Sequence, residues 1–124
     1  MELSVYFKSI IDSDTAPIVI CSNDDEIVYM NPAAVKRYAK RGGEKLVGSS
    51  LSACHNEKSN RMIAMVKQWF SESPDNNRMF TFHNQKENKD VYMIALRDLD
   101  GTLIGYYEKH EYRTSETIVP YEGL

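Results

Sequence analysis

The chain opens with apolar residues at helical spacing. Positions i, i+3, i+4, i+7 and i+8 of one face are occupied by Leu3, Tyr6, Phe7, Ile10 and Ile11. We therefore predict an amphipathic helix over residues 2–13. Its end is predicted by the polar run 12–15, whose side chains compete for backbone hydrogen bonds, and by Pro17, which disfavours helix at the residue before it.

Two short apolar runs, residues 17–21 and 27–30, follow the first helix. Residues 22–25 separate them, and their polar side chains offer a turn backbone local hydrogen-bond partners. This pattern predicts a β-hairpin. Asn31 is a favoured helix N-cap, and Pro32 has the fixed φ that suits a first helical position. We therefore expect the second strand to lead directly into a helix.

The middle of the chain predicts two helices joined by a turn-rich connection around Gly48. The first follows Asn31 and ends at the glycine pair 42–43, since glycine commonly follows a helix C-terminus. The second begins at Glu57, ends near residues 71–74 and has the strongest periodicity in the chain. Its apolar face consists of Met62, Met65, Val66, Trp69 and Phe70.

The remaining apolar runs predict strands over residues 78–84, 90–97 and 102–112. Asp100-Gly101 is a hairpin signal because glycine takes positive φ without steric cost. We therefore expect a three-stranded antiparallel meander. The segment after Arg113 has no clear periodicity.

Composition favours one globular domain. The 124 residues are 42% hydrophobic and 27% charged, which is ordinary globular usage. We expect a single domain over residues 1–113, including the N-terminal helix, and a C-terminal tail over residues 114–124.

Charge and cysteine usage exclude several classes of protein. The formal net charge is −3 and the basic residues are scattered, so we expect no nucleic-acid partner. No secretory leader and no apolar stretch of membrane-spanning length is evident, which indicates a cytoplasmic protein with no membrane partner. Cys21 and Cys54 are too few for a disulfide framework and match no zinc spacing, so we expect reduced thiols and no metal site.

The order and spacing of three motifs carry a resemblance to a known family. Residues 27–34 read as a strand that runs into an Asn-Pro-Ala helix start, Gly48 lies in the connection, and residues 98–105 join two strands through Asp-Gly. Over roughly residues 6–113 the chain resembles the PAS sensor domains. The resemblance implies an α+β fold with a five-stranded antiparallel sheet in the order 2-1-5-4-3, and helices that enclose a pocket on one face.

PAS domains bind haem, flavin, small metabolites or nothing, so the resemblance leaves the cofactor unknown. It implies a sensory or regulatory module in signal transduction, without catalytic activity, that binds a small apolar or planar ligand or a signalling protein partner. Such domains often dimerise through an N-terminal helix, and we expect a homodimer of that kind. No kinase, cyclase or DNA-binding pattern appears within the 124 residues, so we expect output through association with another chain.

Two chromophore-binding branches of the family can be compared with residues 48–55. The stretch lacks the Asn-Cys-Arg order of flavin-binding LOV domains, which disfavours a photochemical flavin thiol. Cys54 also lies nearer to Gly48 than the chromophore cysteine of photoactive yellow protein lies to its corresponding glycine. This spacing disfavours a chromophore attached through a thioester. Residues 54–59 look more like the Cys-His-x-x-Lys-Ser of some uncharacterised PAS-like proteins from anaerobes.

Cys54 and His55 are the candidates for chemistry, because they precede the long helix, whose dipole could lower a thiol pKa. The alternative function is therefore a haem-dependent or thiol-based redox protein centred on this pair, with His55 as the axial ligand. Against it, adjacent side chains diverge, and a capping or surface histidine is the favoured explanation of His55. His83 and His110 lie on the outer strands of the predicted meander, roughly 10 Å apart, too far to share a metal ion.

Several apolar residues at helix and strand spacing could line an adaptable pocket, and the same periodicity suits ordinary core packing. The predicted ligand-binding residues are Met30, Tyr38, Cys54, His55, Met62, Met65, Trp69, Phe80, Phe82, Tyr92 and Ile94.

Overall fold

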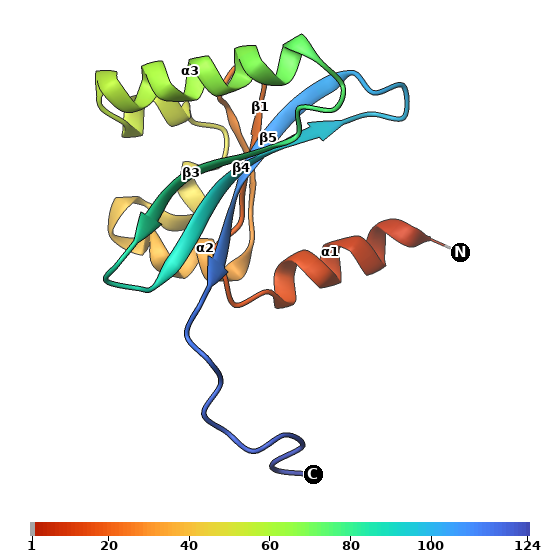
Figure 1. The fold of residues 1–124 in the computed structure, drawn as a ribbon, viewed down its shortest axis with the longest axis vertical. Helices are drawn as coiled ribbons and strands as arrows, with labels where there is room; N and C mark the ends of the chain where they lie inside the picture. Colours follow the sequence, from red (N-terminus) through yellow and green to blue (C-terminus); the bar gives the residue numbers. More distant parts are fainter. Residues whose placement is uncertain (1) are drawn as a thin grey trace.

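One antiparallel sheet organises the protein, whose computed structural model describes residues 2–124. The sheet has five strands in the order β2-β1-β5-β4-β3, which confirms the predicted α+β fold and order. The strands are β1 (Val19–Ser22), β2 (Ile27–Met30), β3 (Arg78–Asn84), β4 (Lys89–Arg97) and β5 (Leu103–Tyr112). Helix α3 lies along one face of the sheet, whereas α1 and the C-terminal tail extend away from it (Figure 1).

The helices are α1 (Leu3–Ser13), α2 (Pro32–Arg37) and α3 (Glu57–Glu72), with three short 3-10 turns, η1 (Ala39–Arg41), η2 (Gly43–Leu46) and η3 (Leu51–Cys54). The helix expected to run from Asn31 to the glycine pair 42–43 therefore ends early, at Arg37. The Tyr38 carbonyl accepts hydrogen bonds from the Arg41 and Gly43 amides, so the chain tightens into 3-10 geometry.

The core lies between the inner face of the sheet and the helices. Strand β4 alternates buried Val91 and Met93 with half-buried Tyr92 and Ile94, as expected for successive side chains on opposite faces. The buried cluster consists of Cys21, Ile27, Met30, Ala34, Val66, Phe70, Met93 and Tyr106. Phe70 and Val66 come from α3, so this helix supplies the apolar cover of the sheet.

Asn31 joins three segments through one fully buried side chain. Its Oδ1 accepts hydrogen bonds from the amides of Ala34 (2.9 Å), as an N-cap of α2, and of Ile18 (2.8 Å), just before β1. Its Nδ2 donates to the carbonyls of Ile11 (2.9 Å) in α1 and Ala16 (3.0 Å). The predicted N-cap is confirmed, and it also fixes the path of the chain from α1 into the sheet.

Arg97 ties the end of α3 to the sheet in a similar way. Its Nη2 donates to the Phe70 carbonyl at 2.7 Å, its Nε to Asn77 Oδ1 at 2.7 Å and its Nη1 to the Gly101 carbonyl at 3.0 Å. A cation at a helix C-terminus also interacts favourably with the helix dipole. The end of α3 therefore has a fixed position over β4.

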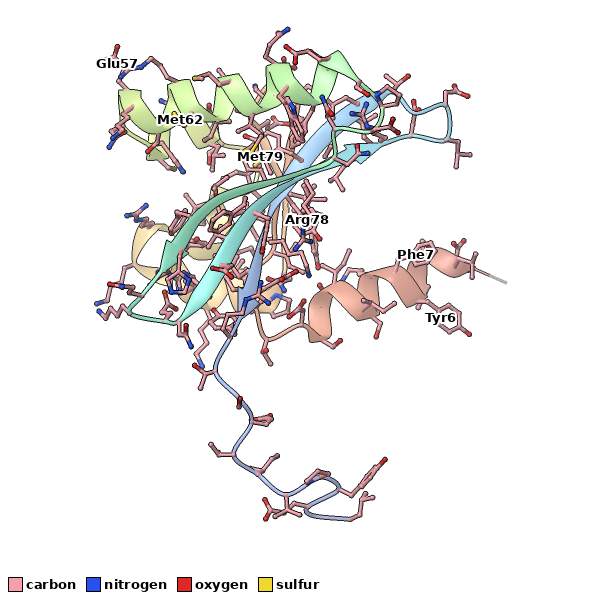
Figure 2. The ribbon with its side chains drawn as sticks, viewed as in Figure 1. Tyr6, Phe7, Glu57, Met62, Arg78 and Met79 are labelled. Carbon is pink, nitrogen blue, oxygen red and sulfur yellow. The ribbon has the colours of Figure 1, made fainter. Side chains whose placement is uncertain are left out.

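Helix α1 packs little against the rest of the protein. None of its residues is buried, Tyr6 and Phe7 are each 57% exposed, and the Tyr6 side chain points away from the sheet (Figure 2). Its contacts near the C-terminal end include hydrogen bonds from Asn31 to Ile11 and from the Tyr29 hydroxyl to Asp12. No helix within residues 2–124 is long and apolar enough to cross a membrane.

Replacing Asn31 with Ala should lower the free energy of unfolding by about 2 kcal/mol or more, because buried backbone groups lose their partners as well as the cap. Asn56 provides a matched control, since it caps α3 through one exposed hydrogen bond to the Ser59 amide. Asn56→Ala should cost roughly 0.5–1 kcal/mol. Urea denaturation measures both values, and equal losses would contradict the assigned role of Asn31.

Candidate ligand-binding cavity

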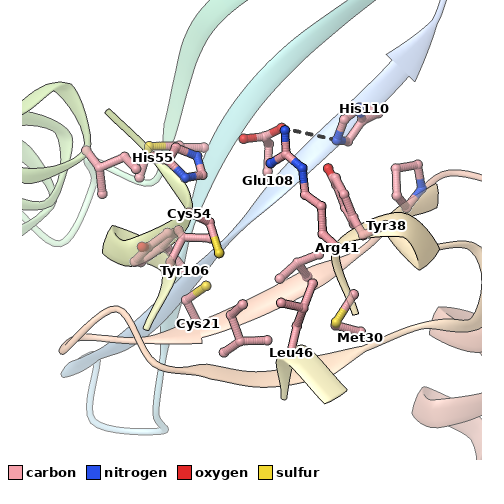
Figure 3. Close-up of a pocket in the computed structure, with 16 residues that line it drawn as sticks. Cys21, Met30, Tyr38, Arg41, Leu46, Cys54, His55, Tyr106, Glu108 and His110 are labelled. Atoms are coloured by element: carbon pink, nitrogen blue, oxygen red, sulfur yellow. Dashed lines mark ion pairs between the residues drawn. The ribbon is translucent and has the colours of Figure 1, made fainter. Parts of the chain in front are cut away.

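A cavity of about 190 Å³ lies between the inner face of the sheet and the helical segments (Figure 3). Most of its wall is apolar and comes from Pro17, Val19, Cys21, Ile27, Met30, Leu46, Leu51, Ile63, Met93 and Tyr106. The polar lining residues are Tyr38, Arg41, Cys54, His55, Glu108 and His110. An apolar wall with a few polar groups is typical of small-molecule sites.

Strand β5 places three of the residues that line the cavity on the inner face of the sheet. Tyr106, Glu108 and His110 occupy alternate positions, so their side chains point to the same side. Tyr106 is opposite Cys21 of β1 and Ala95 of β4, in the centre of the sheet. The polar part of the cavity therefore begins in the strand at the middle of the sheet, where an ordinary core would have apolar residues.

Glu108 and His110 form a pair within this polar region. The distance from His110 Nε2 to Glu108 Oε1 is 3.2 Å, and the His110 side chain is only 5% exposed. His110 Nδ1 is buried and has no hydrogen-bond partner within residues 2–124. In the tautomer whose Nε2–H donates a hydrogen bond to Glu108 Oε1, the His110 Nδ1 is a hydrogen-bond acceptor.

Tyr38 and Arg41 approach the same region from α2 and η1. Burial raises the pKa of the Tyr38 hydroxyl, and the negative charge of Glu108 raises it further, whereas Arg37 and Arg41 oppose this shift. The hydroxyl therefore lies within electrostatic reach of both the anion and the cation. Figure 3 shows Arg41, Tyr38 and Glu108 at one end of the cavity.

The opposite part of the cavity is held by a hydrogen-bonded chain. The Tyr106 hydroxyl donates to Asp25 Oδ1 at 2.7 Å, and Lys67 Nζ of α3 lies 2.9 Å from the same oxygen. Burial, with the bond to Asp25, raises the pKa of Tyr106, and burial raises the pKa of the Cys21 thiol to about 11. The Tyr106 hydroxyl and the Cys21 thiol are therefore protonated at neutral pH. The contacts of Asp25 with Tyr106 and Lys67 fix α3 to the hairpin β1–β2.

Four of the residues predicted from the sequence line the cavity, namely Met30, Tyr38, Cys54 and His55. Cys54 lies at the end of η3, and His55 follows it with a buried Nδ1 that has no partner within the described residues. Asn56, rather than His55, caps α3. The capping role expected for His55 was therefore wrong, because the cap is the next residue.

The other seven predicted residues are not among those that line the cavity. Met62 and Met65 are 53% and 64% exposed on α3, because the face that packs inward is that of Ile63, Val66 and Phe70. Trp69 packs against the core cluster. The remaining four are Phe80, Tyr92 and Ile94, which lie on the outer face of the sheet, and Phe82, which is 48% exposed on the edge strand β3.

Sequence reasoning missed Arg41, Glu108 and His110 as cavity residues. The alternation of Tyr106, Glu108 and His110 was a usable signal, but only once the inward face of β5 is known. His83 and His110 lie on opposite faces of the sheet, since His83 pairs with Asp90 at 2.7 Å and His110 is opposite the buried Val91. Among residues 2–124, no three side chains of the usual metal-ligating kinds gather to hold an ion.

The two thiols should differ sharply in reactivity. With a pKa of about 11, Cys21 is almost entirely protonated at pH 8, and it is also buried, whereas Cys54 is exposed. Iodoacetamide at pH 8 should modify Cys54 and react with Cys21 at least roughly tenfold more slowly. Mass spectrometry of time points measures both rates, with Cys54→Ser and urea-unfolded protein as controls. Equal rates in the folded protein would contradict the assignment.

No protein-family model matches the chain, and no curated protein is significantly similar to it. Solved structures do match. The PAS domain of a Colwellia psychrerythraea protein superposes with a TM-score of 0.64 at 11% identity, over 91% of this chain and 98% of that one. A sensory box sensor histidine kinase from Vibrio cholerae gives a TM-score of 0.61 at 15% identity, over 91% and 93% of the two chains.

The Aer2 receptor from Vibrio cholerae, described as a dual PAS-heme oxygen sensor, gives a TM-score of 0.55 at 18% identity over 79% of this chain and 94% of that one. All three identities are too low to carry over residue roles, so they bear on the fold alone. The sheet order of the present chain and the helices on its inner face agree with this group of structures. The chain therefore has a PAS-like α+β fold.

Proposed function

We propose that the protein is a sensory module of signal transduction that binds a small, largely apolar molecule in the cavity and has no catalytic activity of its own. The PAS-like fold and the two sensor proteins described among its structural neighbours support a sensory role. The single observation that carries ligand binding is the cavity, a partly open and largely apolar space that a well-packed core would fill with side chains.

The cavity volume limits the size of the ligand. At about 190 Å³ it exceeds an engineered cavity of roughly 150 Å³ that binds benzene, and it is smaller than the roughly 300–1,000 Å³ of drug-sized sites. A ligand with one six-membered ring or a branched chain, plus a small polar group, suits this space.

Benzene can serve as the probe of the apolar part, and Ile63→Trp should fill that part from α3. We expect benzene to shift the NMR signals of cavity residues in the parent protein and to bind Ile63→Trp at least roughly tenfold more weakly. Met62→Trp, on the exposed side of the same helix, should bind as the parent does. Failure of the parent to bind benzene would contradict a ligand-accessible cavity.

A haem-dependent protein centred on Cys54 and His55 is the second candidate, favoured because His55 lies on the cavity wall. The cavity does not fit this group, since a porphyrin contains four five-membered rings and the space is close to that for one ring. Protein expressed with haem supplementation should therefore be colourless. A stoichiometric Soret band that is lost in His55→Ala would overturn the proposed function in favour of haem sensing.

For α1, we propose that it mediates association with a second copy of the chain. On its apolar face, Leu3, Tyr6, Phe7 and Ile10 are each more than half exposed, and an isolated helix as short as α1 is marginal in water. A second copy presents the same face, so the contact can be symmetric. This contact would also carry output to the partner.

Phe7→Glu combined with Ile10→Glu should convert a dimer to a monomer at micromolar concentration, because charges replace the apolar face. Ser9→Glu adds a charge elsewhere on the same helix and should leave the dimer intact. Removal of residues 1–13 should have the same effect as the double substitution. Analytical ultracentrifugation measures the mass, and a dimer that persists after both changes would refute the role of α1.

A further inference from the structure

The polar end of the cavity contains one cationic and one anionic side chain. Arg41 comes from η1 and Glu108 from β5, and both line the same space (Figure 3). Within residues 2–124, Arg41 makes no ion pair, and Glu108 pairs only with His110, through Oε1. The guanidinium and the carboxylate therefore retain hydrogen-bonding capacity for a ligand.

We infer that the ligand is a free α-amino acid with an apolar side chain, an inference that depends on the proposed small-molecule cavity. Its carboxylate accepts hydrogen bonds from the Arg41 guanidinium, and its ammonium donates to the Glu108 carboxylate. Its side chain occupies the apolar part lined by Val19, Ile27, Met30, Leu46, Ile63 and Met93.

Charge balance favours a zwitterion over a simple acid or amine. A carboxylic acid would satisfy Arg41 but place a second anion beside Glu108, and an amine would place a second cation beside Arg41. Arg41 is exposed and the Glu108 side chain is 44% exposed, but like charges placed side by side still repel, so each analogue loses one favourable contact and gains an unfavourable one. An amino acid supplies both charges and satisfies both side chains.

The position of the charged end agrees with this orientation. Tyr38 and Arg41 also line a surface hollow, together with Arg37, Lys86 and Glu87. The polar end of the cavity is therefore next to solvent, where a charged head group loses less hydration than it would in the interior. The apolar side chain would enter first and the head group would remain at this opening.

The volume fits the side chains of leucine and phenylalanine. Benzene binds in an engineered cavity of roughly 150 Å³, and the present cavity of about 190 Å³ leaves space for part of a head group. Lysine, glutamate and other charged side chains would have no partner among the apolar lining residues. Selectivity for apolar amino acids follows.

Isothermal titration with three near-isosteric probes tests the inference: L-leucine, 4-methylpentanoic acid, which lacks the amine, and 3-methylbutylamine, which lacks the carboxylate. The parent protein should bind leucine at least roughly tenfold more tightly than either analogue. Glu108→Gln should abolish the preference for leucine over the acid. Arg41→Gln should abolish the preference for leucine over the amine.

Benzene binding separates failure of this inference from failure of the proposed function. Near-ultraviolet circular dichroism of Glu108→Gln and Arg41→Gln should match that of the parent, which shows that the fold is intact. If the parent binds benzene but prefers either analogue to leucine, or binds none of the three probes, the zwitterion is wrong and the cavity remains a ligand site. If neither benzene nor leucine binds, the proposed ligand-binding function is itself wrong.

Discussion

The buried Asn31 side chain is the constraint on which the arrangement of the protein depends. It accepts from the amides of Ile18 and Ala34 and donates to the carbonyls of Ile11 and Ala16, so three segments must meet at one point. Because a buried amide with missing partners is costly, alternatives to this meeting point are disfavoured. Asn31 also follows Met30 on the cavity wall and starts α2, which leads to Tyr38. The same side chain therefore positions one side of the cavity.

The cavity wall combines features with opposite effects on stability. Apolar residues of the hairpin and α3 favour a closed core, whereas Glu108 and His110 occupy inward positions of β5 that an apolar pair would stabilise. The protein tolerates these polar groups because they pair with each other at 3.2 Å and lie next to the opening at Arg41. A polar end beside an apolar interior is the arrangement expected when recognition, rather than maximal stability, has shaped a site.

Local signals in the sequence predicted most of the fold, and the resemblance supplied the sheet order. The Asn31 cap and the strand runs are local patterns, so they could be read directly from the residues. The residues that line the cavity were harder to predict, because they depend on which alternate side chains of each strand point inward. A register shift between Phe80 and Phe82 places successive aromatic residues of β3 on different faces, a change that alternation alone does not reveal. On α3, the packed face is rotated toward Ile63, which leaves Met62 and Met65 exposed.

Residues next to Met30 connect the cavity wall with the helix that we propose for self-association. Helix α1 has no buried residue, and its attachments run through the hydrogen bond of Asn31 to Ile11 and that of Tyr29 to Asp12. Tyr29 and Asn31 flank Met30, whose side chain lines the cavity. Under the proposed function, a ligand that displaces Met30 would therefore act on residues 29–31, which make these two hydrogen bonds to α1. In that proposal, a shift of these residues on ligand binding would pass to α1 through the two hydrogen bonds.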